Sequence, residues 1–268
     1  SQTPVLIAGP TACGKSRLAL QIAKTFGGVV VNADAIQVYG ALQILTARPS
    51  MEDERQGQHL LYGHITFDHA YSVGQWLREV TPLLHGGERP IIIGGTGLYF
   101  QALTQGLAEI PQISPQIIAR SEQVLANAGH TALITELDAA TAARIDLHNP
   151  MRVQRAWQVL HSTGRGLADW QDATPPPMLR VADSIPIVFN VARDWLNQRI
   201  ATRFESMIAE GALDEMRALL PVWSPELPCA KAIGARQLVA YLNGETSLET
   251  AQYEATIATQ QFAKRQRT

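Results

Sequence analysis

Short apolar runs alternate with helix-like segments along the first hundred residues of the chain. PVLIAG at 4–9, VVVNAD at 29–34 and RPIIIGG at 89–95 are continuous runs rich in β-branched residues, as is typical of strands buried on both faces. SRLALQIAKTF at 16–26 has apolar residues at helical spacing instead, and residues 72–84 repeat that pattern. Strands that alternate with helices in this way predict an α/β fold, with a parallel sheet covered by helices on both faces.

The pattern changes near residue 113. SPQIIARSEQVLANAGH, TALITELDAATAARI and PMRVQRAWQVLHSTG follow one another with helical spacing and no strand between them. Three prolines at 175–177 require an extended backbone, which marks the end of this helical stretch. We therefore predict a helical insertion domain at 113–180 within a core made of residues 1–112 and 181–268.

The second part of the core begins with one more apolar run. IPIVFNV at 185–191 predicts a further buried strand of the sheet. Helical spacing returns after it and continues almost to the end of the sequence. The helices expected there span residues 195–210, 212–220, 233–243 and 247–264.

The composition is that of an ordinary globular protein, since 46% of the 268 residues are apolar and 17% are charged. The apolar runs are far shorter than the roughly 20 residues of a membrane helix, and no basic-then-apolar signal pattern opens the sequence. The two cysteines, Cys13 and Cys229, do not suggest a disulfide framework. We expect a cytoplasmic, monomeric protein without membrane contact.

The formal net charge of −2 does not decide whether the partner is a nucleic acid, because clustering of charge matters more than its sum. Arginines are frequent between residues 144 and 203, and the sequence ends in KRQRT. Such a cluster is either a solvated surface with ion pairs or a surface that binds phosphates.

The segment GPTACGKS at 9–16 matches the pattern G-x-x-x-x-G-K-[ST] between a predicted strand and a predicted helix. Gly9 and Gly14 let successive backbone N–H groups curl around a phosphate, and the helix N-terminus adds partial positive charge. Lys15 can reach the outer phosphate oxygens, and Ser16 can ligate Mg²⁺. The pattern predicts a polyphosphate site without indicating what the phosphates are attached to.

Asp34 ends the second predicted strand, so its carboxylate faces the same edge of the sheet as the phosphate loop. It can act as a general base, ligate Mg²⁺ or cap the next turn, and the residues alone leave these roles open. No other apolar run ends in the aspartate that is typical of nucleotide hydrolases, because the run at 91–93 ends in glycine. This absence weakens an ATPase assignment.

Eight motifs follow one another along the chain: GPTACGKSRLAL, NADAIQVYGALQILTARPS, HAYSVGQW, RPIIIGGTGLYFQAL, DLHNPMRVQRAWQVLHSTG, RIATRFESMIAEGALDEMRAL, AIGARQLVAYLNGE and QQFAKRQRT. In this order they resemble the bacterial tRNA dimethylallyltransferases, also called tRNA isopentenyltransferases. The resemblance extends from Val5 to Thr268. Many families share a phosphate loop, whereas eight ordered motifs are specific to one.

The resemblance implies that the loop holds dimethylallyl diphosphate, with Mg²⁺ as cofactor, and that the acceptor is the N6 amine of the tRNA adenosine on the 3′ side of the anticodon. Asp34 matches the family's aspartate that takes the amine proton. Thr11 and the backbone amides of 12–16 match groups that stabilise the departing diphosphate. Thr96 matches the position in the channel where adenine meets the allylic chain, and Arg203 matches the arginine that approaches the reacting groups.

The resemblance also assigns binding residues. Those for the diphosphate are Gly9, Ala12, Cys13, Gly14, Lys15, Ser16, Lys231 and Arg236, with Ser16 also as metal ligand. Those for the tRNA anticodon stem-loop are Gln37, Arg144, Arg152, Arg155 and Arg199, of which Gln37 resembles the position that contacts the target base. In this family the base is flipped into a channel, and the arginines of the insertion suit the phosphates of the stem. Trp157 or Trp170 could stack on a splayed base, but their helical spacing favours the core.

Two positions depart from the family pattern. Ala35 stands where a serine is usual, so a hydrogen bond to the base or to Asp34 is either missing or supplied by water, and Leu45 stands where a glycine is usual, which affects the local turn. Members of the family also continue past KRQRT with an aromatic residue and a helical tail, whose tRNA contacts cannot be read from this sequence.

Three other functions remain open from the residues. A small-molecule kinase with the same loop would use Asp34 to bind a substrate hydroxyl, but the helical insertion is larger than a usual kinase lid. An adenylate isopentenyltransferase would use the same chemistry on a free nucleotide, and the long insertion and basic C-terminal stretch favour tRNA instead. A tRNA-binding protein without catalysis is disfavoured because Lys15, Ser16 and Asp34 are all intact.

Overall fold

The structure, a computed structural model, describes residues 2–267. It divides into two compact units, of which one combines the residues up to Thr104 with those from Met178 onward and the other is Gln105–Pro177. The backbone N–H of Leu179 donates to the carbonyl of Leu103 at 3.1 Å, which ties the chain after the prolines to the first unit. The first unit contains the sheet.

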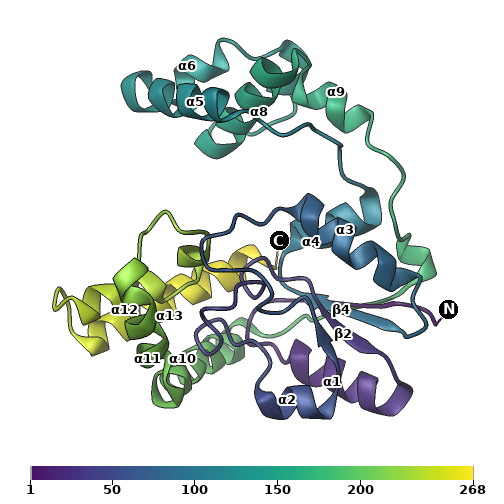
Figure 1. The fold of residues 1–268 in the computed structure, drawn as a ribbon, viewed down its shortest axis with the longest axis vertical. Helices are drawn as coiled ribbons and strands as arrows, with labels where there is room; N and C mark the ends of the chain where they lie inside the picture. Colours follow the sequence, from purple (N-terminus) through teal and green to yellow (C-terminus); the bar gives the residue numbers. More distant parts are fainter. Residues whose placement is uncertain (1, 268) are drawn as a thin grey trace. The chain divides into compact units, whose positions relative to one another are not determined.

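A parallel sheet with the order β3-β2-β4-β1-β5 is the framework of the first unit (Figure 1). Its central strands are the apolar runs expected from the sequence, so the α/β fold class is confirmed. Ala8 pairs with Gly94 in the register, which places the carboxyl ends of β1 and β4 side by side. The strands are β1 (Val5–Ala8), β2 (Val29–Asn32), β3 (His59–Leu60), β4 (Pro90–Gly94) and β5 (Ile185–Val188).

The last strand corrects one prediction. Residues 185–191 were expected to form a buried strand, but β5 lies at the edge of the sheet and its Ile185 and Val188 are exposed. Pro186 has no N–H to donate, and a proline inside a strand is accordingly tolerated at an edge. The apolar composition alone could not distinguish an edge strand from a central one.

Helices cover both faces of the sheet. Trp76 of α3 and Tyr99 of α4 pack with Ile92 on one face, whereas Ala19 of α1 packs with Ile91 on the other. No helix within residues 2–267 combines the length and the apolar character that crossing a bilayer requires. The helices of this unit are α1 (Lys15–Phe26), α2 (Met51–Gln56), α3 (Val73–Leu84), α4 (Gly97–Gln105), α10 (Arg193–Glu210), α11 (Ala212–Leu219), α12 (Ala235–Leu242) and α13 (Leu248–Arg265).

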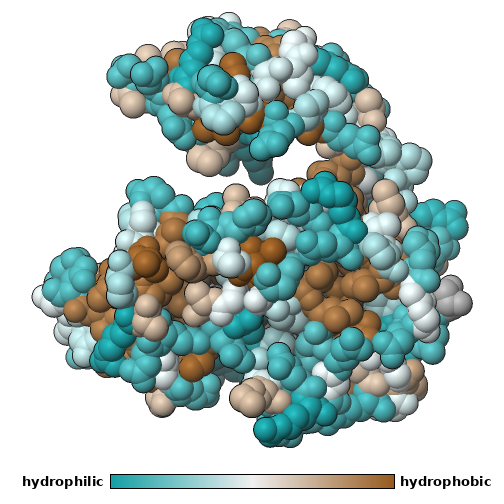
Figure 2. Space-filling view, in the orientation of Figure 1, coloured by the Kyte–Doolittle hydropathy of each residue, from teal (hydrophilic) through white to brown (hydrophobic). Residues whose placement is uncertain are grey.

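The C-terminal helices pack on the loop that follows β2. Leu42 and Leu45 of this loop are buried in one core with Met216 of α11 and Leu238 of α12. Figure 2 shows apolar residues gathered over these helices and bordered by polar ones. The packing fixes the course of the loop, which begins at the carboxyl edge of the sheet.

The second unit is a small helical domain with its own core. Leu133, Val153 and Trp157 are fully buried in it, so Trp157 occupies the core position that its spacing favours. Residues 131–145 were expected to form one helix but form two, because Asp138 caps a new helix by accepting a hydrogen bond from Thr141 N–H. The helices are α5 (Pro115–Ala128), α6 (His130–Ile134), α7 (Ala139–Ala142), α8 (Pro150–Thr163) and α9 (Leu167–Asp172).

Candidate active site

The phosphate loop joins β1 to α1, as its sequence context predicts. A Cβ on Gly9 would lie 2.7 Å from the Cβ of Phe189, so only glycine fits there. Gly14 precedes the helix with φ 100°, and Ala12 also has a positive φ of 61°. Positive φ values at these positions turn the N–H groups of the loop toward one concavity, which is the geometry that binds an anion.

Lys15 lies over this loop. Its Nζ donates to the carbonyl of Pro10 at 2.6 Å and is 3.9 Å from the Sγ of Cys13. Burial lowers the pKa of Lys15 from its ordinary value. The ammonium group is thus held close to the loop amides, in an environment poor in water, where an anion would stabilise its charge.

Two arginines of α10 also reach the loop. The Nη1 of Arg203 donates to the Oγ1 of Thr11 at 3.2 Å, and the Nε of Arg199 donates to the carbonyl of Ala12 at 3.0 Å. Burial lowers the pKa of Arg203, and the neighbouring charge of Arg199 lowers it further. Arg199 was expected to bind tRNA, whereas the structure places its guanidinium against the phosphate loop.

Gln266 is a residue of this site that sequence reasoning missed. Its Oε1 accepts from the N–H of Thr11 at 2.8 Å, and its Nε2 donates to the carbonyl of Gly95 at 3.1 Å. One side chain from the end of the chain therefore ties the loop to the end of β4. In the sequence, the segment KRQRT was interpreted only as a group of positive charges, although it also contains Gln266.

Asp34 lies just past the end of β2, at the carboxyl edge of the sheet, and its neighbours fix its orientation. Its Oδ1 accepts from the N–H of Ile36 at 2.9 Å, while Oδ2 has no hydrogen-bond partner in the described part of the chain. The fully buried side chain of Asn32 fixes the backbone on either side of Asp34, because it accepts from Asp34 N–H at 2.9 Å and donates to Asp34 C=O at 3.0 Å. This arrangement leaves one carboxylate oxygen available for chemistry.

Two adjoining cavities meet at Asp34. The first, which we call the phosphate cavity, has a volume of about 210 Å³ and is lined by residues of the phosphate loop, by Arg199 and by Gln266. The second, which we call the apolar cavity, has a volume of about 360 Å³. The side chains common to both include Thr11, Asp34, Gln37 and Arg203. The apolar members of the second cavity include Ile36, Leu45, Ile200, Phe204, Ile233 and Phe262.

The phosphate cavity and the apolar cavity suit two different parts of a ligand. Amides and cations in the phosphate cavity suit a diphosphate, whereas aliphatic and aromatic walls in the apolar cavity suit a hydrocarbon chain and a planar base. Asp34 and Arg203 line both, so a carboxylate and a guanidinium face the place where an alkyl carbon would be joined to its phosphate.

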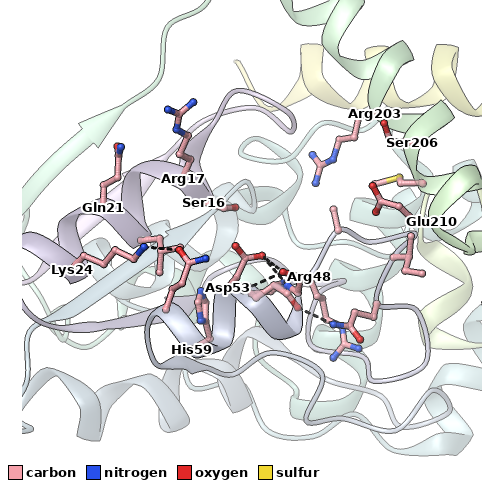
Figure 3. A pocket seen from close by; sticks show the side chains of 18 residues that line it. Ser16, Arg17, Gln21, Lys24, Arg48, Asp53, His59, Arg203, Ser206 and Glu210 are labelled. Carbon is pink, nitrogen blue, oxygen red and sulfur yellow. Dashed lines mark hydrogen bonds between the residues drawn. The ribbon is translucent and has the colours of Figure 1, made fainter.

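A third and larger cavity of about 630 Å³ lies between α1 and α10 and shares Ser16 and Arg203 with the phosphate site (Figure 3). In Figure 3, side chains of α1 line one side of it and side chains of α10 the other, and most of the residues that line it are of polar or charged type. The labelled members are Ser16, Arg17, Gln21, Lys24, Arg48, Asp53, His59, Arg203, Ser206 and Glu210.

The other predicted residues lie in several places. Thr96 accepts from Ala35 N–H at 3.1 Å, which brings it beside Asp34. Lys231 lines the apolar cavity, whereas Arg236 donates to the carbonyl of Pro225 and lines none of the three cavities described above. Arg236 is thus not brought to the loop.

The arginines predicted to contact tRNA from the insertion all lie in the second unit. Arg144 is paired with Asp172 through two hydrogen bonds of 2.6 and 2.9 Å. Arg152 and Arg155 are exposed and three residues apart on α8, so they share one face of that helix.

The departures at Ala35 and Leu45 have local explanations. Ala35 uses its backbone N–H, rather than a side chain, to bond Thr96. Leu45 is not among the residues of positive φ, so its turn does not require glycine, and its buried side chain lines the apolar cavity.

Two family models match the chain. One, described as IPP transferase, matches residues 37–268, and the other, described as Isopentenyl transferase, matches residues 3–64. A tRNA dimethylallyltransferase of Cereibacter sphaeroides is 56% identical over 268 residues, which cover 100% of this chain and 85% of the relative. A tRNA dimethylallyltransferase of a Ruegeria species is 55% identical over 265 residues, which cover 99% of this chain and 91% of the relative.

Solved structures are similar as well. The full-length tRNA isopentenylpyrophosphate transferase of Bacillus halodurans superposes with a TM-score of 0.69 at 29% identity, covering 99% of this chain and 86% of that one. A eukaryotic dimethylallyltransferase, solved in snapshots acting on tRNA, has a TM-score of 0.84 at 24% identity and covers 99% of this chain and 69% of its own. The second likeness bears on the fold alone.

Proposed function

The chain belongs to the IPP transferase family, and on that basis we propose that it transfers a dimethylallyl group from dimethylallyl diphosphate to the N6 amine of the tRNA adenosine on the 3′ side of the anticodon. Membership confirms the resemblance drawn from the eight motifs, and it does not favour the kinase alternative. The observation that carries the proposal is the position of Asp34, whose carboxylate lines both the phosphate cavity and the apolar cavity.

Asp34 serves as the base. The lone pair of an exocyclic adenine amine is delocalised into the ring, so the amine is a weak nucleophile until its proton is removed. As N6 attacks the allylic carbon, the new C–N bond forms, the bond from that carbon to the bridging oxygen breaks with its electron pair going to the diphosphate, and the N6 proton passes to Asp34 Oδ2. Oδ1 keeps its hydrogen bond to Ile36 and so maintains the orientation.

The leaving diphosphate gains negative charge, and the loop is built to stabilise it. Backbone amides, the Nζ of Lys15 and the guanidinium of Arg203 converge on the phosphate cavity. Thr11, held by Arg203 and Gln266, lies at the junction where the bridging oxygen departs.

Mg²⁺ fits the donor set. Among residues 2–267 no group of three or more His, Cys, Asp or Glu side chains is placed to hold a metal ion, so an ion at this site would rely on Ser16 Oγ and on phosphate oxygens. Mg²⁺ commonly binds in that way, with few protein ligands. When bound, it would neutralise charge on the diphosphate.

Because Asn32 supports Asp34, replacing Asn32 should lower both the stability of the protein and its activity. Asn32→Ala removes three partly buried hydrogen bonds, to Asp34 N–H, Asp34 C=O and Leu61 C=O, and leaves these groups without partners. We expect the free energy of unfolding to fall by about 1–3 kcal/mol and the transfer rate to fall as well, because Asp34 loses its support. Urea denaturation and single-turnover assays measure both quantities. Asn243→Ala, which removes an exposed hydrogen bond, is the control, and an unchanged transfer rate for Asn32→Ala would show that Asn32 does not position the base.

We propose that the exposed arginines of α8 bind phosphates of the anticodon stem. Replacing Arg152 and Arg155 with glutamine should weaken tRNA binding and reduce the slope of log K against log salt by about 0.7–0.9 for each phosphate that is no longer neutralised. Arg180→Gln is the control, since Arg180 is exposed but paired with Asp183. Equal salt slopes for the double variant and the native protein would exclude phosphate binding by these arginines.

One assay tests the substrate class. The protein and Mg²⁺ are incubated with radiolabelled dimethylallyl diphosphate and either unmodified tRNA or AMP, and a parallel sample receives ATP with small hydroxylated acceptors. The proposal predicts label in tRNA alone. Label on AMP would indicate a cytokinin-type transferase, and ATP-dependent phosphorylation without prenyl transfer would indicate a kinase.

A further inference from the structure

Gln37 has a side-chain amide of fixed orientation. Its Nε2 donates to the carbonyl of Thr46 at 2.8 Å and to the carbonyl of Ala47 at 3.1 Å. An amide nitrogen has two hydrogens, so both are used. The reverse orientation would place the amide oxygen against two carbonyl oxygens and is excluded electrostatically.

The amide oxygen of Gln37 is therefore its free polar atom. Gln37 lines both the phosphate cavity and the apolar cavity, and its Oε1 has no hydrogen-bond partner within residues 2–267. An oxygen in this position accepts a hydrogen bond but cannot donate one. It favours a base edge that offers N–H over one that offers a carbonyl oxygen.

The two carbonyls that hold Gln37 belong to a turn that contains one strained backbone position. Ala47 has a φ of 52°, in the left-handed region that costs free energy for a residue with a Cβ. Local bonds from Ala47 N–H to Ile44 C=O at 2.9 Å and from Arg48 N–H to Gln43 C=O at 3.0 Å close the turn. Contacts from outside the turn therefore help to select this conformation.

Glu215 supplies that support. Its Oε1 accepts from the N–H of Ile44 at 2.7 Å, and its Oε2 accepts from the N–H of Leu45 at 3.1 Å. Both carboxylate oxygens are thus bonded to adjacent amides of the turn. Glu215 lies in the first turn of α11, next to the fully buried Met216, so the carboxylate is mounted on a packed element.

We propose that Glu215 is a positioning residue for base selection: by clamping the turn 43–48 it holds the amide oxygen of Gln37 toward the acceptor base and selects a base that carries an exocyclic amine. The proposal rests on the proposed function, because it takes the base to be the tRNA adenosine. Glu215 acts through Gln37 and touches no substrate.

A kinetic comparison tests the clamp. Glu215→Gln replaces one acceptor oxygen by an NH₂ group that faces a backbone N–H, so the turn should shift. We expect kcat/KM for tRNA to fall by about 10-fold or more, with the KM for dimethylallyl diphosphate unchanged. Asp214→Asn is the matched control, because the side chain of this neighbour on α11 bonds Arg217, away from the turn, and the change should leave kcat/KM unaltered.

A double-mutant cycle separates positioning from general stability. If Glu215 acts through Gln37, then Glu215→Gln should add little to the loss caused by Gln37→Ala. Additive losses would overturn the proposal. A wild-type protein that fails to transfer to tRNA would count against the proposed function and this proposal together, whereas normal transfer by both wild type and Glu215→Gln counts against the clamp alone.

Binding gives a readout that does not depend on chemistry. The affinity for an anticodon stem-loop with adenosine at the target position is compared with that for one with inosine, which offers a carbonyl oxygen in place of the amine. Wild type should prefer adenosine, and Glu215→Gln should bring the two affinities closer. If Glu215→Gln does not fold, Gln37→Glu breaks the other half of the clamp, the hydrogen bonds from Gln37 to the turn, since a carboxylate cannot donate to the carbonyls of Thr46 and Ala47. A preference for adenosine equal to that of wild type in either folded variant would overturn the proposal.

Discussion

Replacing Asp34 with asparagine is expected to lower the rate of dimethylallyl transfer by about 10²- to 10⁴-fold while the affinity for tRNA changes little. The asparagine oxygen can still accept from Ile36 N–H, so the loop after β2 keeps its conformation. The variant lacks the free carboxylate oxygen to which we assign the N6 proton.

Single-turnover assays with saturating enzyme measure this loss without interference from product release, and filter binding measures the affinity for tRNA. Asp68→Asn provides a control, because Asp68 is exposed and its replacement removes one carboxylate elsewhere in the same unit. Transfer by Asp34→Asn at the wild-type rate would remove Asp34 from the chemistry. A parallel loss of tRNA binding would indicate that Asp34 serves mainly in binding.

Lys15→Met is expected to lower kcat/KM for dimethylallyl diphosphate by about 10²- to 10³-fold, because the variant lacks the ammonium group that we propose stabilises the departing diphosphate. Methionine keeps the length and much of the apolar stem, so packing against the loop is retained. Lys24→Met removes a lysine of the same helix whose Nζ bonds Gln56, and it serves as control. Retention of the wild-type kcat/KM by Lys15→Met would contradict the assignment of Lys15 to the leaving group.

The same variant should not be less stable at neutral pH. Burial holds the pKa of Lys15 below its ordinary value of 10.5, so folding disfavours the charged form. This cost is fully present below the lowered pKa and disappears as the pH rises from that pKa to 10.5, so stability attributable to Lys15 increases over that window. Urea denaturation should therefore give Lys15→Met an unfolding free energy equal to or above that of wild type at pH 7, with the difference narrowing at alkaline pH. A variant clearly less stable than wild type at pH 7 would show that the Lys15 ammonium group stabilises the fold instead.

Local patterns determined how much of the fold was predictable. β1, β2 and β4 are buried on both faces, and burial of that kind requires the continuous apolar runs from which they were predicted. β3 has two residues, too few to show a period, and β5 carries an apolar sequence at an exposed edge. The break between α6 and α7 depends on a single capping aspartate within a helical pattern.

In the candidate site, too, features set by neighbours in sequence could be predicted, whereas contacts between distant residues could not. The phosphate loop and Asp34 lie on short motifs and could be predicted, because their chemistry is set by neighbours in sequence. The hydrogen bond of Gln266 with Thr11 and that of Glu215 with Ile44 join residues that are 255 and 171 positions apart. Helical spacing placed Arg199 and Arg203 on one face of α10, but only the packed structure shows that this face meets the phosphate loop.

The most direct test of the proposed reaction is to identify the product of a single turnover. Unmodified tRNA is incubated with the protein, Mg²⁺ and radiolabelled dimethylallyl diphosphate, digested to nucleosides, and analysed by chromatography with mass spectrometry, after partial digestion to locate the site. We predict that all label is found as N6-dimethylallyl adenosine from the position 3′ to the anticodon. Label on another atom or nucleoside, or diphosphate release without label in tRNA, would contradict the proposed reaction.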